Sequence, residues 1–349
     1  MNASVFEKIV AAFDWKDLSK DITINNVTSL TSGLINHTWK LATPTNSYII
    51  QKINTNIFSQ PDFIDQNINF IGNYLQVTNP NYLFTNPLKN KSGESLLLIE
   101  GGAYRIFHFI SNTRTIKVVT NELEAFEAAK TFALFTHNLI NFDAKSLHIT
   151  LADFHNLSKR FDQFTHAIKE NNTERFTKTQ SLIQSFLQHK TIVDRFEAFI
   201  HHKDVHIRVT HHDTKISNVL FDETGKGLCV IDLDTVMPGY YFSDVGDMFR
   251  TYLSPVSEEE ADLDKISIRK NLFKAIENGY FNTLKNNLSS FEIDNFYLSG
   301  EILMYMQALR FLTDYLQNDM YYGKKYPDHN LVRAQNQFRL LQLYQEAIH

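Results

Sequence analysis

The chain has few cysteines, which cross-link a fold, and few glycines and prolines, which interrupt helices and strands. Its 349 residues include 1 cysteine, 12 glycines and 7 prolines, which excludes an internal disulfide and argues against a disordered Gly/Pro-rich chain. The lone cysteine, Cys229, lies in the apolar run 228–231, a position typical of a buried core thiol. Free thiols are usual in a reducing compartment, so we expect a cytoplasmic protein.

Long apolar runs and an excess of one charge are also missing. No stretch reaches the roughly 18 uninterrupted apolar residues of a membrane span. The N-terminal segment 1–17 is interrupted by Glu7, Lys8 and Asp14, which indicates an amphipathic helix instead of a signal peptide. The net charge is -5 with both signs interspersed, whereas nucleic-acid surfaces need clustered basic residues. We therefore expect no nucleic-acid or membrane partner, and no obligate protein partner is evident.

Apolar and aromatic residues, in contrast, are plentiful. Hydrophobic residues make up 43% of the chain, enough for about two domain-sized cores at roughly 150 residues per domain. Segments rich in β-branched or aromatic residues predict strands in the first third: 22–30, 37–41, 48–53, 95–99 and 104–110. Between the third and fourth of these, spacings of four, three and four predict one helix with a buried stripe at Ile64, Ile68, Ile71 and Leu75.

From residue 122 onward, long helical segments replace the strands. The pattern predicts an α+β fold of two lobes, a small β-rich N-lobe over residues 1–110 and a larger, mostly helical C-lobe over 111–349. The short polar stretch 111–115 is the expected boundary. Because ligand sites are often built between domains, we expect the functional site where the lobes meet.

The segment 209–234, VTHHDTKISNVLFDETGKGLCVIDLD, carries polar residues where a core would require apolar ones. Asp213 is followed five residues later by Asn218, and a predicted hairpin then returns the chain to Asp232. Neighbouring strands lie about 4.8 Å apart, so Asn218 and Asp232 are expected to converge at one end of the hairpin. An amide oxygen and carboxylates are ligands that Mg²⁺ prefers.

This spacing matches the phosphoryl-transfer template of kinases. In that template an Asp accepts the acceptor hydroxyl proton, as expected for Asp213, while an Asn and a second Asp hold Mg²⁺ against ATP, as expected for Asn218 and Asp232. Two alternatives are open. In the first, Asp213 caps a helix and Asp232 and Asp234 lie in an acidic loop, which leaves the spacing unexplained. In the second, zinc is bound by histidines from the set His201, His202, His206, His211 and His212, of which His202 and His206 are four residues apart. No cysteine lies near those histidines.

The N-lobe supplies the expected phosphate contacts. A kinase needs a cation on its third strand, and Lys52 occupies that strand. The helix that follows has no glutamate to pair with it; Asp62 and Asp65 are its only acids, so the partner of Lys52 stays open. The turn containing Gly33 is expected to cover the phosphates with backbone N–H groups.

Two further segments have predicted roles. Phe109 and Ile110 occupy the expected position between the lobes where backbone groups meet the adenine edge, although an ordinary buried strand is an equal alternative. The acidic run from Ser257 to Asp264 predicts the start of an N-capped helix, because carboxylates are favoured at a helix N-terminus.

At these residues the chain resembles the aminoglycoside phosphotransferase and choline kinase superfamily, and within it the N-acetylhexosamine 1-kinase branch. The resemblance spans nearly the whole chain and is carried by these segments: YIIQKIN (48–54), YRIFHFISNTRT (104–115), HHDTKISNVLFD (211–222), CVIDLDTVMPG (229–239), SDVGDMFR (243–250) and RFLTDYLQNDMYYGKKYPDHNLVRAQNQF (310–338). It implies a protein-kinase-like fold, ATP with Mg²⁺, and transfer of the γ-phosphate to the anomeric hydroxyl of N-acetylglucosamine or N-acetylgalactosamine.

The resemblance also implies roles for individual residues. It implies that Asp234 is an auxiliary metal carboxylate and that Arg310 and Tyr321 bind the sugar, with Asp244 and Asp247 supporting the catalytic loop. The resemblance implies the same roles as those given above: Asp213 as the base, Asn218 and Asp232 as metal ligands, and Lys52 as the phosphate contact. Arg310 has an alternative, an ordinary ion pair with the acid four residues further along the same helix.

Other functions remain open at this level. The same chemistry could serve an aminoglycoside, choline, homoserine or methylthioribose. Choline favours an aromatic cage, but Trp15 and Trp39 both lie outside the acceptor lobe, and a charge of -5 is modest for a polycationic acceptor. A nucleotide-binding protein without catalysis is the third possibility, and the intact motif argues against it.

Overall fold

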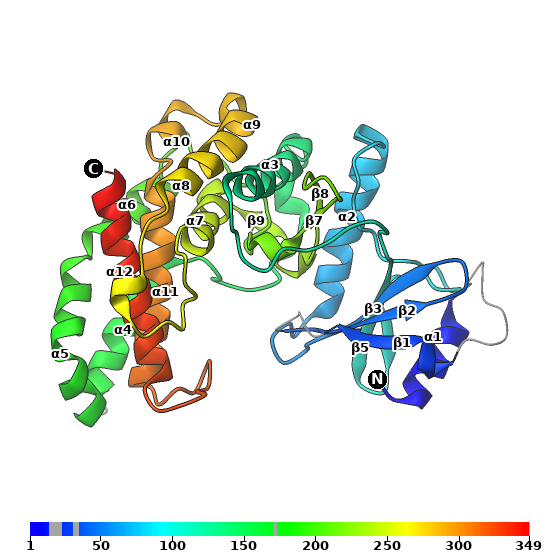
Figure 1. The fold of residues 1–349 in the computed structure, drawn as a ribbon, viewed down its shortest axis with the longest axis horizontal. Coiled ribbons are helices and arrows are strands. Elements are labelled where there is room, and N and C mark those ends of the chain that lie inside the picture. Colours follow the sequence, from blue (N-terminus) through cyan, green and yellow to red (C-terminus); the bar gives the residue numbers. More distant parts are fainter. Residues whose placement is uncertain (14–22, 31–34, 171–172, 349) are drawn as a thin grey trace.

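The computed structural model describes residues 1–13, 23–30, 35–170 and 173–348. Within these residues the chain forms a small lobe around an antiparallel sheet and a larger helical lobe, which confirms the predicted α+β, two-lobed class (Figure 1). None of the described helices combines the length and hydrophobicity needed to span a bilayer.

The N-lobe sheet contains five strands within the described residues, in the order β1-β2-β3-β5-β4, each antiparallel to its neighbour. The strands are β1 (Val27–Leu30), β2 (His37–Ala42), β3 (Ser47–Ile53), β4 (Leu97–Ile99) and β5 (Gly102–His108). The first predicted strand, 22–30, was too long, because residues 24–26 form a 3-10 turn before β1. The last predicted strand, 104–110, was displaced by two residues, so Phe109 and Ile110 follow β5 instead of ending it.

Two helices pack with this lobe, α1 (Ala3–Ala12) and α2 (Pro61–Thr78). α1 covers one face of the sheet, where Phe6 and Ile9 join Tyr48 and Ile50 in a small core. The predicted stripe of α2 is confirmed, since its four apolar residues are all buried. They belong to the large core of the C-lobe, and α2 lies between the sheet and the helical lobe in Figure 1. The boundary at residue 110 stays a prediction.

The C-lobe is built around α11 (Leu298–Leu316), which packs against α12 (His329–Ile348) and α7 (Tyr241–Tyr252). The remaining α-helices among the described residues are α3 (Glu122–Asn138), α4 (Leu157–Glu170), α5 (Thr173–Gln188), α6 (Thr191–Ile200), α8 (Lys270–Ile276), α9 (Asn282–Leu284) and α10 (Ser290–Asp294), and a π-helix over Glu277–Phe281 joins α8 to α9. Two small hairpin-like ladders pair β6 (Arg208–Thr210) with β9 (Met237–Gly239), and β7 (Val219–Phe221) with β8 (Gly227–Val230). Cys229 is a free, fully buried thiol in β8, as predicted.

The β7–β8 hairpin is fixed from both sides. It packs on α3, and Gly227 lies so close to that helix that a Cβ there would be 2.1 Å from Thr131 Oγ1. The segment entering the C-lobe also pairs with it, because Arg114 and Phe221 exchange backbone hydrogen bonds of 2.9 Å. The hairpin is therefore held where the two lobes meet.

Candidate active site

The ends of the β7–β8 hairpin bring together two of the predicted site residues. Val219 pairs with Val230, and the Ile231 N–H donates to the Asn218 carbonyl over 2.9 Å. Asn218 and Asp232 therefore emerge from the same end of the hairpin, as the spacing predicted. Asp232 adopts a left-handed backbone with φ of 60°, which is uncommon outside glycine and turns the chain sharply after β8.

Asp213 is held between a cation and an amide. Lys215 Nζ lies 3.0 Å from its Oδ1, and Asn218 Nδ2 donates to its Oδ2 over 3.1 Å and to its carbonyl over 2.9 Å. Burial by itself raises the pKa of this carboxyl, but Lys215 and the further positive charge of Arg250 together outweigh burial, and the net pKa is lowered. The carboxylate is thus ionised near neutral pH and able to accept a proton.

Sequence analysis assigned no role to Lys215. Its only signal was its place two residues after Asp213 in HHDTK, a spacing that does not by itself make the two side chains meet.

Two carboxylates of α7 brace the loop that carries Asp213, as predicted. Asp244 accepts hydrogen bonds from the backbone N–H groups of His211 (3.2 Å) and His212 (2.8 Å). Asp247 accepts one from the Thr214 N–H (2.9 Å). Burial lowers the pKa of the His212 imidazole to about 4, so this ring is neutral and has a structural role.

The free oxygens near the hairpin end fit a hard cation. No hydrogen bond within the described residues uses the Asp232 carboxylate or Asn218 Oδ1. Desolvation by the surrounding protein, and then the negative charges of Asp234 and Asp213, raise the pKa of Asp232 to about 7. The nearby cations Arg105 and Lys215 oppose this rise without cancelling it. Two oxygen donors in a negative field fit Mg²⁺, which usually keeps water and phosphate oxygens as its other ligands.

The zinc alternative finds no support. Across the described ranges, no group of three His, Cys, Asp or Glu side chains is arranged to hold a metal. α6 ends at Ile200, before both histidines, so they do not share a helical face. His202 instead stacks on Phe291, with ring centroids 3.6 Å apart.

Asp234 connects the two lobes. Its Oδ2 accepts a hydrogen bond from Asn36 Nδ2 (2.6 Å), and its Oδ1 pairs with the guanidinium of Arg105 on β5. Asn36 is itself fixed, because its Oδ1 accepts from the Asn54 N–H over 2.9 Å. Both oxygens of Asp234 thus have N-lobe partners, and its role as an auxiliary metal ligand stays a prediction.

Lys52 lies on the face of the N-lobe sheet opposite to the face that carries Arg105. It is directly opposite Tyr104 in the β3–β5 pairing, and its Nζ is 5.8 Å from the centre of that ring. Tyr104 belongs to the small core covered by α1. Among the described residues Lys52 forms no ion pair with Asp62 or Asp65, and Asp65 instead accepts a hydrogen bond from Ser95 (2.8 Å). Gly33 lies outside the described residues.

Phe109 and Ile110 keep free backbone groups at the connection between the lobes. The Phe109 N–H donates to the Ser47 carbonyl (2.9 Å), and the Ile110 carbonyl accepts from Thr113 Oγ1 (2.6 Å). The Phe109 carbonyl and the Ile110 N–H have no partner among the described residues. These two groups belong to one trans peptide and point in opposite directions, so the pair cannot serve a single adenine edge, and the role of Phe109 and Ile110 stays a prediction.

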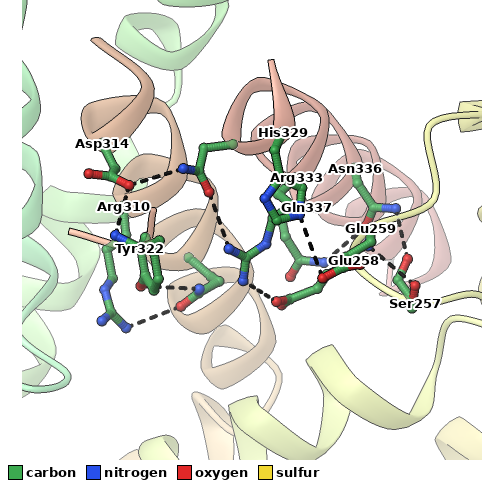
Figure 2. A network of polar contacts seen from close by, with 12 residues as sticks. Ser257, Glu258, Glu259, Arg310, Asp314, Tyr322, His329, Arg333, Asn336 and Gln337 are labelled. Carbon is green, nitrogen blue, oxygen red and sulfur yellow. Dashed lines mark hydrogen bonds and ion pairs between the residues drawn. The ribbon is translucent and has the colours of Figure 1, made fainter. Parts of the chain in front are cut away.

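Arg310 does not pair with the acid four residues further along α11. Asp314 instead accepts hydrogen bonds from the backbone N–H groups of Tyr321 (2.7 Å) and Tyr322 (3.0 Å), which ties the loop after α11 to that helix. Arg310 donates only to Gln307 (3.2 Å) among the described residues. Figure 2 shows Arg310 and Asp314 pointing apart.

Aromatic rings surround this guanidinium. Its central carbon lies 5.8 Å from the ring of Phe154, 5.9 Å from that of Tyr321 and 5.4 Å from that of Tyr322. A second cation lies nearby, since burial and then the positive charge of Arg310 lower the pKa of Arg160. The structure therefore brings Arg310 and Tyr321 together in a positively charged, aromatic environment.

The acidic run after α7 does not begin an α-helix, contrary to the prediction, although Asp262 caps a short 3-10 helix over Leu263–Lys265. Residues 257–260 form a turn, in which Glu258 pairs with Arg250 Nη1 (3.1 Å) and with Arg333 of α12. Asn336 donates to the carbonyls of Ser257 (3.1 Å) and Glu260 (3.0 Å), as Figure 2 shows for the labelled residues. These tertiary partners compete successfully with the helix dipole, which contributes only about 0.3–1 kcal/mol per surface charge.

Comparison with known proteins agrees with this geometry. The small antiparallel lobe and the larger helical lobe together form a two-lobed, kinase-like fold. Residues 139–266 match the model of the phosphotransferase enzyme family. The matched segment contains Asp213, Asn218 and Asp232.

Solved structures share the fold over almost the whole chain. The microcompartment-associated aminopropanol kinase matches with a TM-score of 0.62 at 14% identity, covering 99% of this chain and 98% of that one. An aminoglycoside phosphotransferase from Alicyclobacillus acidocaldarius matches with a TM-score of 0.60 at 12% identity, covering 98% and 94%. Spectinomycin phosphotransferase in complex with ADP and its antibiotic matches with a TM-score of 0.60 at 10% identity, covering 99% and 98%.

Proposed function

We propose that this protein is an ATP-dependent kinase that phosphorylates the anomeric hydroxyl of an N-acetylhexosamine. The observation that carries the kinase assignment is the ionised Asp213, oriented by Lys215 and Asn218 at the hairpin end from which Asp232 also emerges. The family match supports phosphoryl transfer, and the ADP complex of the spectinomycin enzyme supports ATP as the donor.

Each residue then has a defined task. The Asp213 carboxylate takes the proton of the acceptor hydroxyl while that oxygen forms its bond to the γ-phosphorus. The bond from that phosphorus to the β,γ-bridging oxygen breaks, ADP leaves, and Asp213 returns its proton to solvent. Asn218 and Asp232 would hold Mg²⁺, which neutralises charge on the phosphate oxygens.

The acceptor end supports a neutral sugar over a cationic acceptor. Arg310, the residue that the resemblance assigns to the sugar, lies near the second cation Arg160, and within the described residues it has no carboxylate partner. A guanidinium repels choline or a protonated aminoglycoside but can donate hydrogen bonds to hydroxyl and acetamido oxygens. The surrounding rings of Phe154 and Tyr321 can cover the apolar face of a pyranose.

A panel of acceptors tests this proposal. The full chain is incubated with ATP, Mg²⁺ and, in turn, N-acetylglucosamine, N-acetylgalactosamine, glucosamine, choline, homoserine, methylthioribose and an aminoglycoside, and ADP release is measured. We expect turnover with the N-acetylated sugars and phosphate on C1 by phosphorus-coupled NMR. Phosphate on a primary hydroxyl, or preferred turnover of a cationic acceptor, would contradict the acceptor assignment, and no ADP release with any acceptor would contradict the kinase assignment.

A further inference from the structure

We propose that Arg105, and not Lys52, is the cation that contacts the nucleotide phosphates, and that Gln51 and Asp234 orient it. The inference rests on the proposed function and assigns a new residue to its ATP site. Nothing in the sequence distinguished Arg105 from the other residues of its strand, because sequence reasoning expected the cation on β3.

The alternation of the sheet decides which side chains face the C-lobe. Successive residues of a strand point to opposite faces, and directly opposite residues of paired strands share a face. Gln51 is opposite Arg105, and Lys52 is opposite Tyr104. Arg105 reaches Asp234 in the C-lobe, so the face that carries Lys52 is turned away from the hairpin.

The guanidinium of Arg105 is oriented but incompletely paired. Its Nε (2.9 Å) and Nη2 (2.6 Å) donate to Gln51 Oε1, and Nη2 also pairs with Asp234. Its Nη1 is buried and has no hydrogen-bond partner in the described part of the chain. Buried donors are nearly always satisfied, so an unpaired one beside a ligand site indicates an acceptor that the ligand supplies.

The chemistry of that donor suits a phosphate. A planar guanidinium matches the oxygens of phosphate in geometry and in charge. Three carboxylates, those of Asp213, Asp232 and Asp234, lie around this point and would otherwise repel a polyphosphate. Because Arg105 is only 1% exposed, a phosphate reaches Nη1 only if neighbouring side chains move when the nucleotide binds.

The test compares ADP with adenosine, which lacks phosphates. Calorimetric titrations of the full chain, without added metal and again with Mg²⁺, give the ratio of ADP affinity to adenosine affinity for wild type, Arg105→Met, Arg105→Lys and Lys52→Met. We expect the ratio to fall about 10- to 100-fold in Arg105→Met, since charge-assisted hydrogen bonds have that effect. A smaller fall is expected in Arg105→Lys, and none in Lys52→Met.

Adenosine binding reports whether each variant is folded. Since Arg105→Met leaves Asp234 buried without its cation, the double variant Arg105→Met with Asp234→Asn removes both charges and is measured as well. An unchanged ratio in the Arg105 variants, or a fall confined to Lys52→Met, would overturn the inference while leaving the kinase proposal intact. Wild-type protein that binds neither ADP nor adenosine would instead overturn the proposed function.

Discussion

Lys215 Nζ lies 3.0 Å from Oδ1 of Asp213, on the side of the carboxylate opposite the amide of Asn218. The ammonium group stabilises the ionised form of Asp213, and the amide fixes the plane of its carboxyl group. Preorganisation of this kind is what a general base needs, because no reorientation is required when the proton moves.

Replacing Asp213 by Asn keeps the shape of the side chain and removes the base. We expect kcat to fall by about 10² to 10⁴, with the affinity for ADP nearly unchanged, because Asp213 acts on the acceptor hydroxyl. Steady-state kinetics and ADP titration measure the two effects. Turnover at the wild-type rate would show that Asp213 is not the base.

Asp232→Ala removes a proposed metal ligand. We expect the part of nucleotide affinity that depends on Mg²⁺ to disappear, so that titrations of ADP with Mg²⁺ and with EDTA give the same curve. Glu223→Ala is the matched control, since Glu223 is an exposed acid in the turn of the same hairpin. If Asp232→Ala retained the full effect of Mg²⁺, the metal site would lie elsewhere.

Arg310→Ala tests the acceptor end. Loss of a charged donor predicts a rise of about 10- to 100-fold in KM for the sugar, with KM for ATP unchanged. Arg339→Ala on α12, which removes an arginine without an ion pair in the described residues, is expected to change neither constant. Equal effects on both constants in Arg310→Ala would indicate a structural role instead.

The turn at Glu258 predicts part of the acid sensitivity of the fold. Burial opposes ionisation of Glu258, but Arg250 and Arg333 outweigh it, so the pKa of this carboxyl is lowered in the folded protein. Such a group stabilises the fold above its unfolded pKa, near 4.5, and the contribution is lost as the pH falls through the folded pKa.

Urea unfolding between pH 3 and pH 7 measures this contribution. We expect Glu258→Gln to be less stable than wild type at pH 7 and to lose less stability on acidification. Glu223→Gln serves as the exposed control, with a pH dependence like that of wild type. Parallel curves for wild type and Glu258→Gln would show that the pair with Arg250 and Arg333 contributes little.

The local patterns determined much of the fold. The four-three-four spacing located the buried stripe of α2 because a helix repeats every 3.6 residues, and this requires no knowledge of the partner. The motif from Asp213 to Asp232 placed two oxygen donors at one end of a hairpin because antiparallel pairing follows from a short turn. The helix start predicted at the acidic run after Ser257 was wrong, because a local pattern does not show partners on α12, which are distant in the sequence.

By itself, the sequence determined the strands, the amphipathic helices and the hairpin with its polar ends, because each depends on contacts between near neighbours in the chain. Tertiary structure alone decided that Arg105 and not Lys52 faces Asp234. Alternation along a strand places the two side chains on opposite faces of the sheet, but only the packing of α1 decides which of these faces the helix covers. It also decided that Arg310 is free of Asp314, whose carboxylate is taken by backbone N–H groups of a loop that folds back onto α11.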